Sequence, residues 1–170
     1  MSGTLRKLLL TAHVVASVGW AGAVLGFLGL ALSSMLSSDS DLARGAYLSM
    51  ELTGRYVLLP LALASLATGV AQSLATKWGL FHHYWVVIKL IINLIATLLL
   101  LIYMQTLAHL ANRAREATSP AELDRLASFS PVLHAVLALV LLLVATTLGV
   151  YKPRGLTPIG QRKRRHARPG

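Results

Sequence analysis

The chain contains no cysteine, and only six of its 170 residues are acidic. The absence of cysteine excludes disulfides, thiolate nucleophiles, iron–sulfur ligation and cysteine-based zinc sites. Any metal would have to be bound by histidine, methionine, tyrosine or carboxylate side chains. Apolar residues are abundant instead, because 55% of the chain is hydrophobic. The composition indicates an integral membrane protein without room for a second domain.

The apolar residues form four long runs, at about residues 8–33, 55–76, 84–108 and 131–151. Each run is close to or above the roughly 20 residues that a helix needs to cross about 30 Å of hydrocarbon. We therefore expect an all-α fold, a four-helix transmembrane bundle formed by residues 1–152. Residues 153–170 are predicted to be a basic tail. Four spans place both termini on the same side of the membrane.

The charges are divided unevenly between the two sides of the predicted bundle. Ten Lys and Arg residues and no acid lie in the N-terminal segment, the connection around Lys77 and the tail. The other two connections hold five Arg and all six carboxylates: Asp39, Asp41, Glu51, Glu116, Glu122 and Asp124. By the positive-inside bias, both termini are predicted to be cytoplasmic.

The formal charge of +10 does not predict nucleic-acid binding, because the excess is concentrated in the tail directly after a span. Basic residues at that position orient a membrane protein and attract anionic lipid. The expected partners are therefore the bilayer itself, anionic lipid at the tail and, within the membrane, a redox partner or a second copy of the chain. Nucleic acid is not expected.

Several local patterns predict where helices begin and bend. Asp39 is an N-cap candidate for a helix that extends the second span outward, and Pro60 should interrupt that span. Ser119 to Glu122 has the form of a capping box, which predicts a short helix through about Ser128. In the first span, Gly22 and Gly26 form a GxxxG pattern, which predicts close packing against a neighbouring helix.

Two ionisable residues lie deep within the predicted spans, and such residues are candidates for function because they are costly in hydrocarbon. His13 lies about five residues beyond the inner boundary of the first span, and Lys89 lies five residues beyond that of the third. At 1.5 Å per residue both are roughly 7–9 Å above the boundary. We therefore expect these two side chains to share one layer of the bundle.

Each of these residues belongs to a polar stripe along its helix. His13, Ser17 and Trp20 follow one helical face, and Trp85, Lys89 and Asn93 follow another, so the two stripes should face each other or a cavity. His13 is either a neutral imidazole hydrogen-bonded to a neighbouring helix or a ligand of heme iron or another metal. Lys89 either extends its ammonium to the headgroups or forms part of a site.

A second histidine layer is predicted near the other boundary. His134 begins the fourth span three residues after Pro131, and His109 ends the third. His134 is deep enough for either a packing role or a role as a second ligand. His109 is expected to be hydrated. Ser65 and Thr68 give the second span a polar stripe that should bind another helix.

Some of these sequence patterns resemble those of known families. The pattern His13-x6-Trp20-x-Gly22 with Trp85-x3-Lys89-Leu90 is similar to small four-span proteins of the HemJ protoporphyrinogen oxidase and copper-resistance CopD type. Segments 47–54, 78–85 and 150–155 are similar to integral membrane proteins common in actinobacteria, and that similarity brings no function. The first resemblance implies heme b between helices, with His13 as axial ligand and Lys89 as the charged partner of a propionate or substrate.

The leading hypothesis is a multi-pass protein of the bacterial inner (plasma) membrane that binds heme b and acts in membrane electron transfer or heme metabolism. It would be a heme-dependent oxidoreductase if Lys89 is catalytic. The residues expected to hold the cofactor are His13, His134, Trp20 and Asn93, with heme iron bound by His13 and with His134 as either a second ligand or part of a second site. The alternatives are a non-enzymatic membrane subunit or scaffold, and a copper or small-cation permease using His13, Met50, Met104 and His109.

Overall fold

The computed structural model describes residues 3–75 and 79–166, without the side chains of residues 163–166. Within these ranges the chain is helical and has four helices that are long and apolar enough to cross a membrane. Lys77, Trp78 and Arg168 lie outside the described residues. The helices are α1 (Gly3–Leu36), α2 (Ser40–Thr53), η1 (Gly54–Leu58), α3 (Leu59–Ala75), α4 (Tyr84–Glu116), α5 (Pro120–Asp124), α6 (Ser130–Tyr151) and α7 (Pro158–His166).

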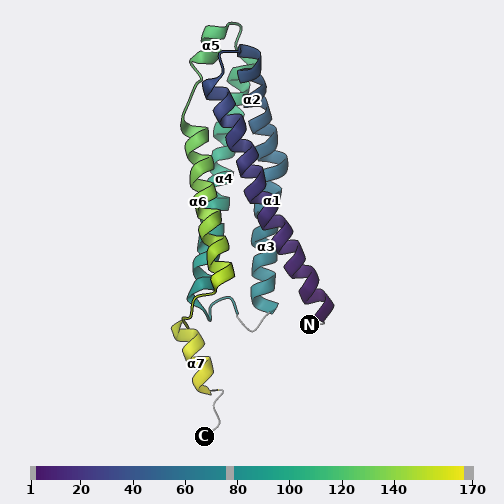
Figure 1. Cartoon of the computed structure of the whole chain (residues 1–170), viewed down its shortest axis with the longest axis vertical. Helices are drawn as coiled ribbons and strands as arrows, with labels where there is room; N and C mark the ends of the chain where they lie inside the picture. Colours follow the sequence, from purple (N-terminus) through teal and green to yellow (C-terminus); the bar gives the residue numbers. More distant parts are fainter. Residues whose placement is uncertain (1–2, 76–78, 167–170) are drawn as a thin grey trace.

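The four long helices form an elongated bundle (Figure 1). Helices α2, η1 and α3 follow one another without a break, so they act as one helix from Ser40 to Ala75. Helix α1 packs against this long helix and against α6, and α4 packs against the same two partners. Helices α1 and α4 therefore face each other across the diagonal of the bundle. Side chains that join these two helices must cross the bundle interior.

The two ends of the bundle differ in charge and in structure. At one end, here called the acidic end, α5 and the connections on either side of it cover the helices (Figure 1). The six carboxylates belong to α2 and the residue before it, to the last residue of α4 and to α5. The start of α1, the end of α6 and the short helix α7 lie at the other end, here called the basic end (Figure 1). The backbone of the predicted tail pairs there with the connection before α4, since Thr157 N–H donates to the His82 carbonyl at 3.0 Å.

Pro60 disturbs its helix as its sequence position predicts. A proline has no N–H and its ring crowds the preceding turn, so a regular i→i−4 ladder cannot continue through it. The chain forms a π-helical turn, η1, immediately before this proline, and Leu59 N–H donates to the Gly54 carbonyl. The widened turn absorbs the mismatch without ending the helix.

Two predicted local features differ from the structure. Gly22 and Gly26 are exposed, and a Cβ added at either would meet no atom of the described residues within 4 Å, so the GxxxG pattern does not pack inside this chain. Helix α5 ends at Asp124, and the Ser119 side chain does not cap it. Glu122 instead accepts from the Thr118 amide and hydroxyl, which lowers the pKa of that carboxyl.

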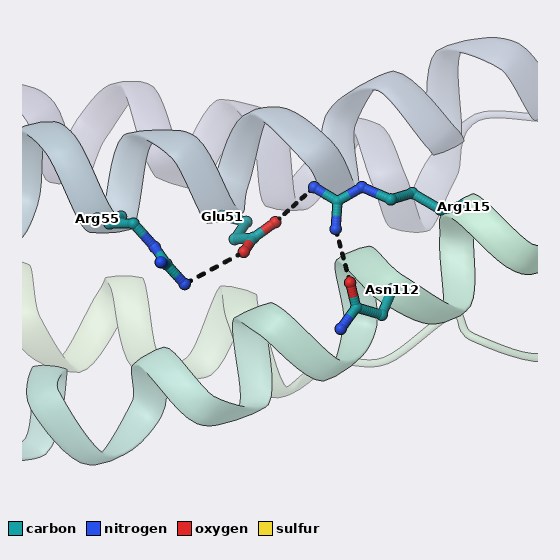
Figure 2. A network of polar contacts seen from close by, with 4 residues as sticks. All are labelled: Glu51, Arg55, Asn112 and Arg115. Atoms are coloured by element: carbon teal, nitrogen blue, oxygen red, sulfur yellow. Dashed lines mark hydrogen bonds and ion pairs between the residues drawn. The ribbon is translucent and has the colours of Figure 1, made fainter.

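Asp39 caps α2 as predicted, because its Oδ1 accepts from the Asp41 and Leu42 amides. Farther along α2, Glu51 binds two arginines (Figure 2). Its carboxylate lies 3.4 Å from Arg55 on the same long helix and 2.8 Å from Arg115 on α4. The Arg115 contact ties α2 to α4 near the acidic end, and Arg115 is also held by Asn112 at 2.6 Å.

Candidate functional site

His13 is enclosed by polar partners on two other helices. It is 7% exposed, its Nδ1 lies 3.1 Å from the Ser65 carbonyl and 3.2 Å from Thr68 Oγ1, and its Nε2 lies 3.3 Å from Lys89 Nζ. An ammonium has donors only, so Nε2 is the acceptor. The ring proton then sits on Nδ1 and is donated to the Ser65 carbonyl. His13 is thus a neutral imidazole held between α3 and α4.

The predicted meeting of His13 and Lys89 in one layer is confirmed by this contact. It crosses the α1–α4 diagonal, and Ser17 adds a second polar link to α3 through a 2.8 Å contact with Ser65 Oγ. Two glycines make room for it: a Cβ at Gly69 would lie 3.0 Å from His13 Cε1, and one at Gly149 would lie 3.2 Å from Lys89 Nζ. The predicted polar stripe of α3 therefore binds α1.

A separate apolar cavity of about 210 Å³ lies farther along the bundle toward the acidic end. Its walls come from α1, η1, α4 and α6, and its lining is almost entirely aliphatic or aromatic. The lining side chains are Trp20, Val24, Phe27, Leu58, Ala96, Leu99, Leu100, Tyr103, Leu107, His134, Ala135, Leu137, Ala138 and Leu141.

His134 lies in this wall with a fixed orientation. Its Nδ1 lies 2.8 Å from the Ser130 carbonyl one turn earlier, and its ring stacks on Tyr103 with centroids 3.9 Å apart and planes 15° apart. Because a carbonyl only accepts, Nδ1 carries a proton, and in the neutral imidazole Nε2 then carries a lone pair. Nε2 makes no hydrogen bond to the described part of the chain. A histidine fixed in this way through one nitrogen presents the other to a ligand.

Trp20 supplies a second polar atom in the cavity wall. The residue is 2% exposed and lines the cavity. Its indole N–H is a donor, and it makes no hydrogen bond to the described residues. The atom is not among the fully buried unpaired polar atoms of the described residues, so it keeps accessible surface and is available to a ligand or a water molecule.

The predicted site residues fall into two groups. His13 and Lys89 meet near the basic end, and Trp20 and His134 share the apolar cavity. Lys89 lies against Gly149, which is fifteen residues along α6 from His134, or about 22 Å at 1.5 Å per residue. Asn93, 6% exposed, belongs to neither group: its side chain makes no hydrogen bond to the described residues and does not line the cavity.

Known proteins add nothing to this description. Comparisons with protein-family models, curated proteins and solved structures find no match for this chain. The chemistry of the two groups therefore has to be derived from their own atoms.

The residues do not fit a heme as the helices are packed here. At His13 the Lys89 amine occupies the position in front of Nε2, the atom that would bind iron. At His134 the donor chemistry is suitable, because Nε2 is free and Nδ1 is bound to a carbonyl. The volume of the cavity is not suitable. An apolar cavity of about 150 Å³ holds a single benzene ring, and 210 Å³ leaves room for little more than substituents on such a ring. Heme b stays a prediction from the sequence.

The described residues contain no group of three or more His, Asp or Glu side chains that could hold a metal ion. Met50 is fully buried in the hydrophobic core, and His109 is exposed on α4, as the sequence predicted.

Tyr103 of the cavity wall and its partner Ser130 were not among the predicted site residues. Tyr103 stacks on His134, and its hydroxyl lies 3.2 Å from Ser130 Oγ. The spacing of Ser130 and His134 by four residues on one helix was a usable signal, because such residues share a face. The position of Tyr103 opposite them had no signal in the sequence.

Proposed function

We propose that this chain is a multi-pass membrane protein that binds a small lipophilic ring compound taken from the bilayer. The observation that carries the proposal is the apolar cavity of about 210 Å³ whose lining includes His134. Cavities lined by apolar side chains stay dry and bind apolar ring compounds. Trp20, Phe27 and Tyr103 favour a flat aromatic ligand, because aromatic rings pack well face to edge or offset.

The route of entry is lateral rather than through the ends of the bundle. Leu99 of α4 and Leu137 of α6 line the cavity, yet they are 48% and 52% exposed. Side chains that line a cavity and also face outward mark the place where it meets the surface of the bundle. That surface faces lipid, because both helices are long and apolar enough to span a membrane. A ligand entering between α4 and α6 would therefore come from the hydrocarbon phase.

The orientation of the chain is part of the proposal. The basic end would be cytoplasmic, because in the sequence the N-terminal segment, the connection around Lys77 and the tail carry ten Lys and Arg residues and no acid. The cavity would then lie in the half of the bilayer away from the cytoplasm, and the His13–Lys89 pair in the cytoplasmic half.

The proposal is tested by contact quenching of Trp20 with para-dibromobenzene. The variant Trp78→Phe, Trp85→Phe leaves Trp20 as the last of the three tryptophans, so its fluorescence reports the cavity alone. Bromine quenches an indole that it touches. We expect saturable quenching in detergent solution, at probe concentrations where free N-acetyltryptophanamide in the same micelles is not quenched.

Two further substitutions in the single-tryptophan protein separate cavity binding from surface quenching. Ala138→Phe fills the cavity and should abolish saturable quenching. Val140→Phe adds the same ring to an exposed position of the same helix and should leave quenching unchanged. Quenching that rises linearly with the probe and is equal in both variants would overturn the proposal.

A further inference from the structure

The polar atoms of the cavity are arranged as one acceptor and one donor. His134 Nε2 is an acceptor, because its Nδ1–H is donated to the Ser130 carbonyl. The Trp20 indole N–H is a donor. The remaining polar group in the wall, the Tyr103 hydroxyl, is already engaged with Ser130. A ligand that satisfies both free atoms must donate at one end and accept at the other.

The two residues that carry these atoms lie at opposite ends of the cavity. Trp20 is the lining residue of α1 nearest the basic end, and Phe27 of the same helix lies seven residues toward the acidic end. On α6 the order is reversed, since His134 is nearest the acidic end and Leu141 lies seven residues toward the basic end. Seven residues correspond to about 10 Å along the axis. The ligand should therefore carry its polar groups on opposite sides of one ring.

We propose that the cavity binds a lipid-soluble para-hydroquinone, with one hydroxyl donating to His134 Nε2 and the other accepting from the Trp20 N–H. This inference rests on the proposed function and names its ligand class. A hydroxyl both donates and accepts, so the reduced ring satisfies both atoms. The oxidised quinone has carbonyls only and could accept from Trp20, but it would place an acceptor against the acceptor of His134. Any apolar tail would leave through the opening between Leu99 and Leu137.

The structure therefore assigns to the cavity a preference for the hydroquinone over the corresponding quinone. Leaving a buried acceptor without a donor is more costly than the average gain from one hydrogen bond. We expect the hydroquinone to bind at least about fivefold more tightly than the matching quinone.

The test compares trimethylhydroquinone with trimethylbenzoquinone by isothermal titration calorimetry of the full-length detergent-solubilised protein under argon. These headgroup compounds have no long tail, so partition into micelles is small. The expected result is tighter binding of the hydroquinone. Equal affinities, or tighter binding of the quinone, would overturn the inference, and this comparison needs no variant.

Substitutions assign the effect to the two atoms. His134→Phe keeps a ring against Tyr103 but removes Nε2. In this variant the hydroquinone affinity should fall until it equals the quinone affinity. Trp20→Phe should weaken both compounds by a similar factor, because both can accept from the indole. His109→Phe, at the exposed histidine of α4, is the matched control and should change neither.

Para-dibromobenzene separates failure of this inference from failure of the proposed function. If dibromobenzene quenches Trp20 saturably while the hydroquinone shows no preference, the cavity binds lipophilic rings but not through this donor–acceptor pair. If neither dibromobenzene nor the hydroquinone binds, both proposals fail.

Discussion

His13 and Lys89 are joined across the diagonal of the bundle by a hydrogen bond of 3.3 Å between Nε2 and Nζ. The ion pairs of the described residues involve Glu51 at the acidic end, and none of them reaches Lys89. The imidazole is thus the hydrogen-bond acceptor for this amine inside the bundle. Lys89 therefore depends on His13 for a buried acceptor, and His13 Nε2 depends on Lys89 for its donor.

Removing both partners should cost less than the sum of the two single losses. His13→Leu leaves the Lys89 amine without its acceptor, and Lys89→Met leaves His13 Nε2 without its donor. We expect each single change to lower the free energy of unfolding by about 1–3 kcal/mol. In the double variant the losses should fall short of additivity by at least about 1 kcal/mol. Unfolding in mixed micelles with increasing sodium dodecyl sulfate measures all four proteins.

A shifted lysine provides the control for this pair. Ile88 is 44% exposed and so points away from the interior. The variant Lys89→Met, Ile88→Lys should therefore not restore the stability lost in Lys89→Met. Full recovery would mean that the lysine needs only headgroup contact and that its bond to His13 contributes nothing.

Membrane orientation is testable because the chain has no native cysteine. Single cysteines at Ser38 and Asp124 lie at exposed positions of the acidic end, and Arg162→Cys lies at an exposed position of α7. In intact cells, an impermeant maleimide should label the first two. It should label the third only after permeabilisation, because the basic end is proposed to be cytoplasmic. Labelling at Arg162→Cys in intact cells would reverse the orientation. Gly160 is unsuitable, since a side chain there would strike the His82 carbonyl.

The two arginines that bind Glu51 should contribute unequally to stability (Figure 2). The Arg115 contact is 2.8 Å and joins two helices, whereas the Arg55 contact is 3.4 Å within one helix. Both arginines are about half exposed, so solvent weakens both pairs. We expect Arg115→Gln to cost about 0.5–1 kcal/mol and Arg55→Gln less than about 0.5 kcal/mol. Added salt should reduce the difference, and an equal cost for both would contradict the geometry.

Absorption spectroscopy tests the heme hypothesis separately. Because the cavity holds about one ring, we expect the purified protein to show no Soret band in either oxidation state. A Soret band that disappears in His134→Phe but persists in His13→Leu would establish heme at the cavity and require α4 and α6 to separate. The opposite pattern would establish it at His13, after displacement of Lys89.

The sequence was most informative where a pattern acts through a single element. Asp39 caps its helix, and Pro60 produces a local irregularity, because each effect depends on the backbone within one turn. Gly22 and Gly26 show the limit of such patterns. Small residues permit close packing, but whether a helix lies against them depends on how that helix is rotated in the bundle. Here they face outward.

The sequence by itself determined four long apolar helices, their order and the uneven distribution of charge, because length and hydrophobicity are properties of each segment. It also predicted that His13 and Lys89 share a layer, since depth follows from residue count. The tertiary structure decided which helices lie on the diagonal. It therefore decided that the Lys89 amine is hydrogen-bonded to His13 Nε2. It also decided that His134 and Trp20 line a separate cavity. Rotations and contacts between helices depend on all the side chains at an interface together, and no single segment encodes them.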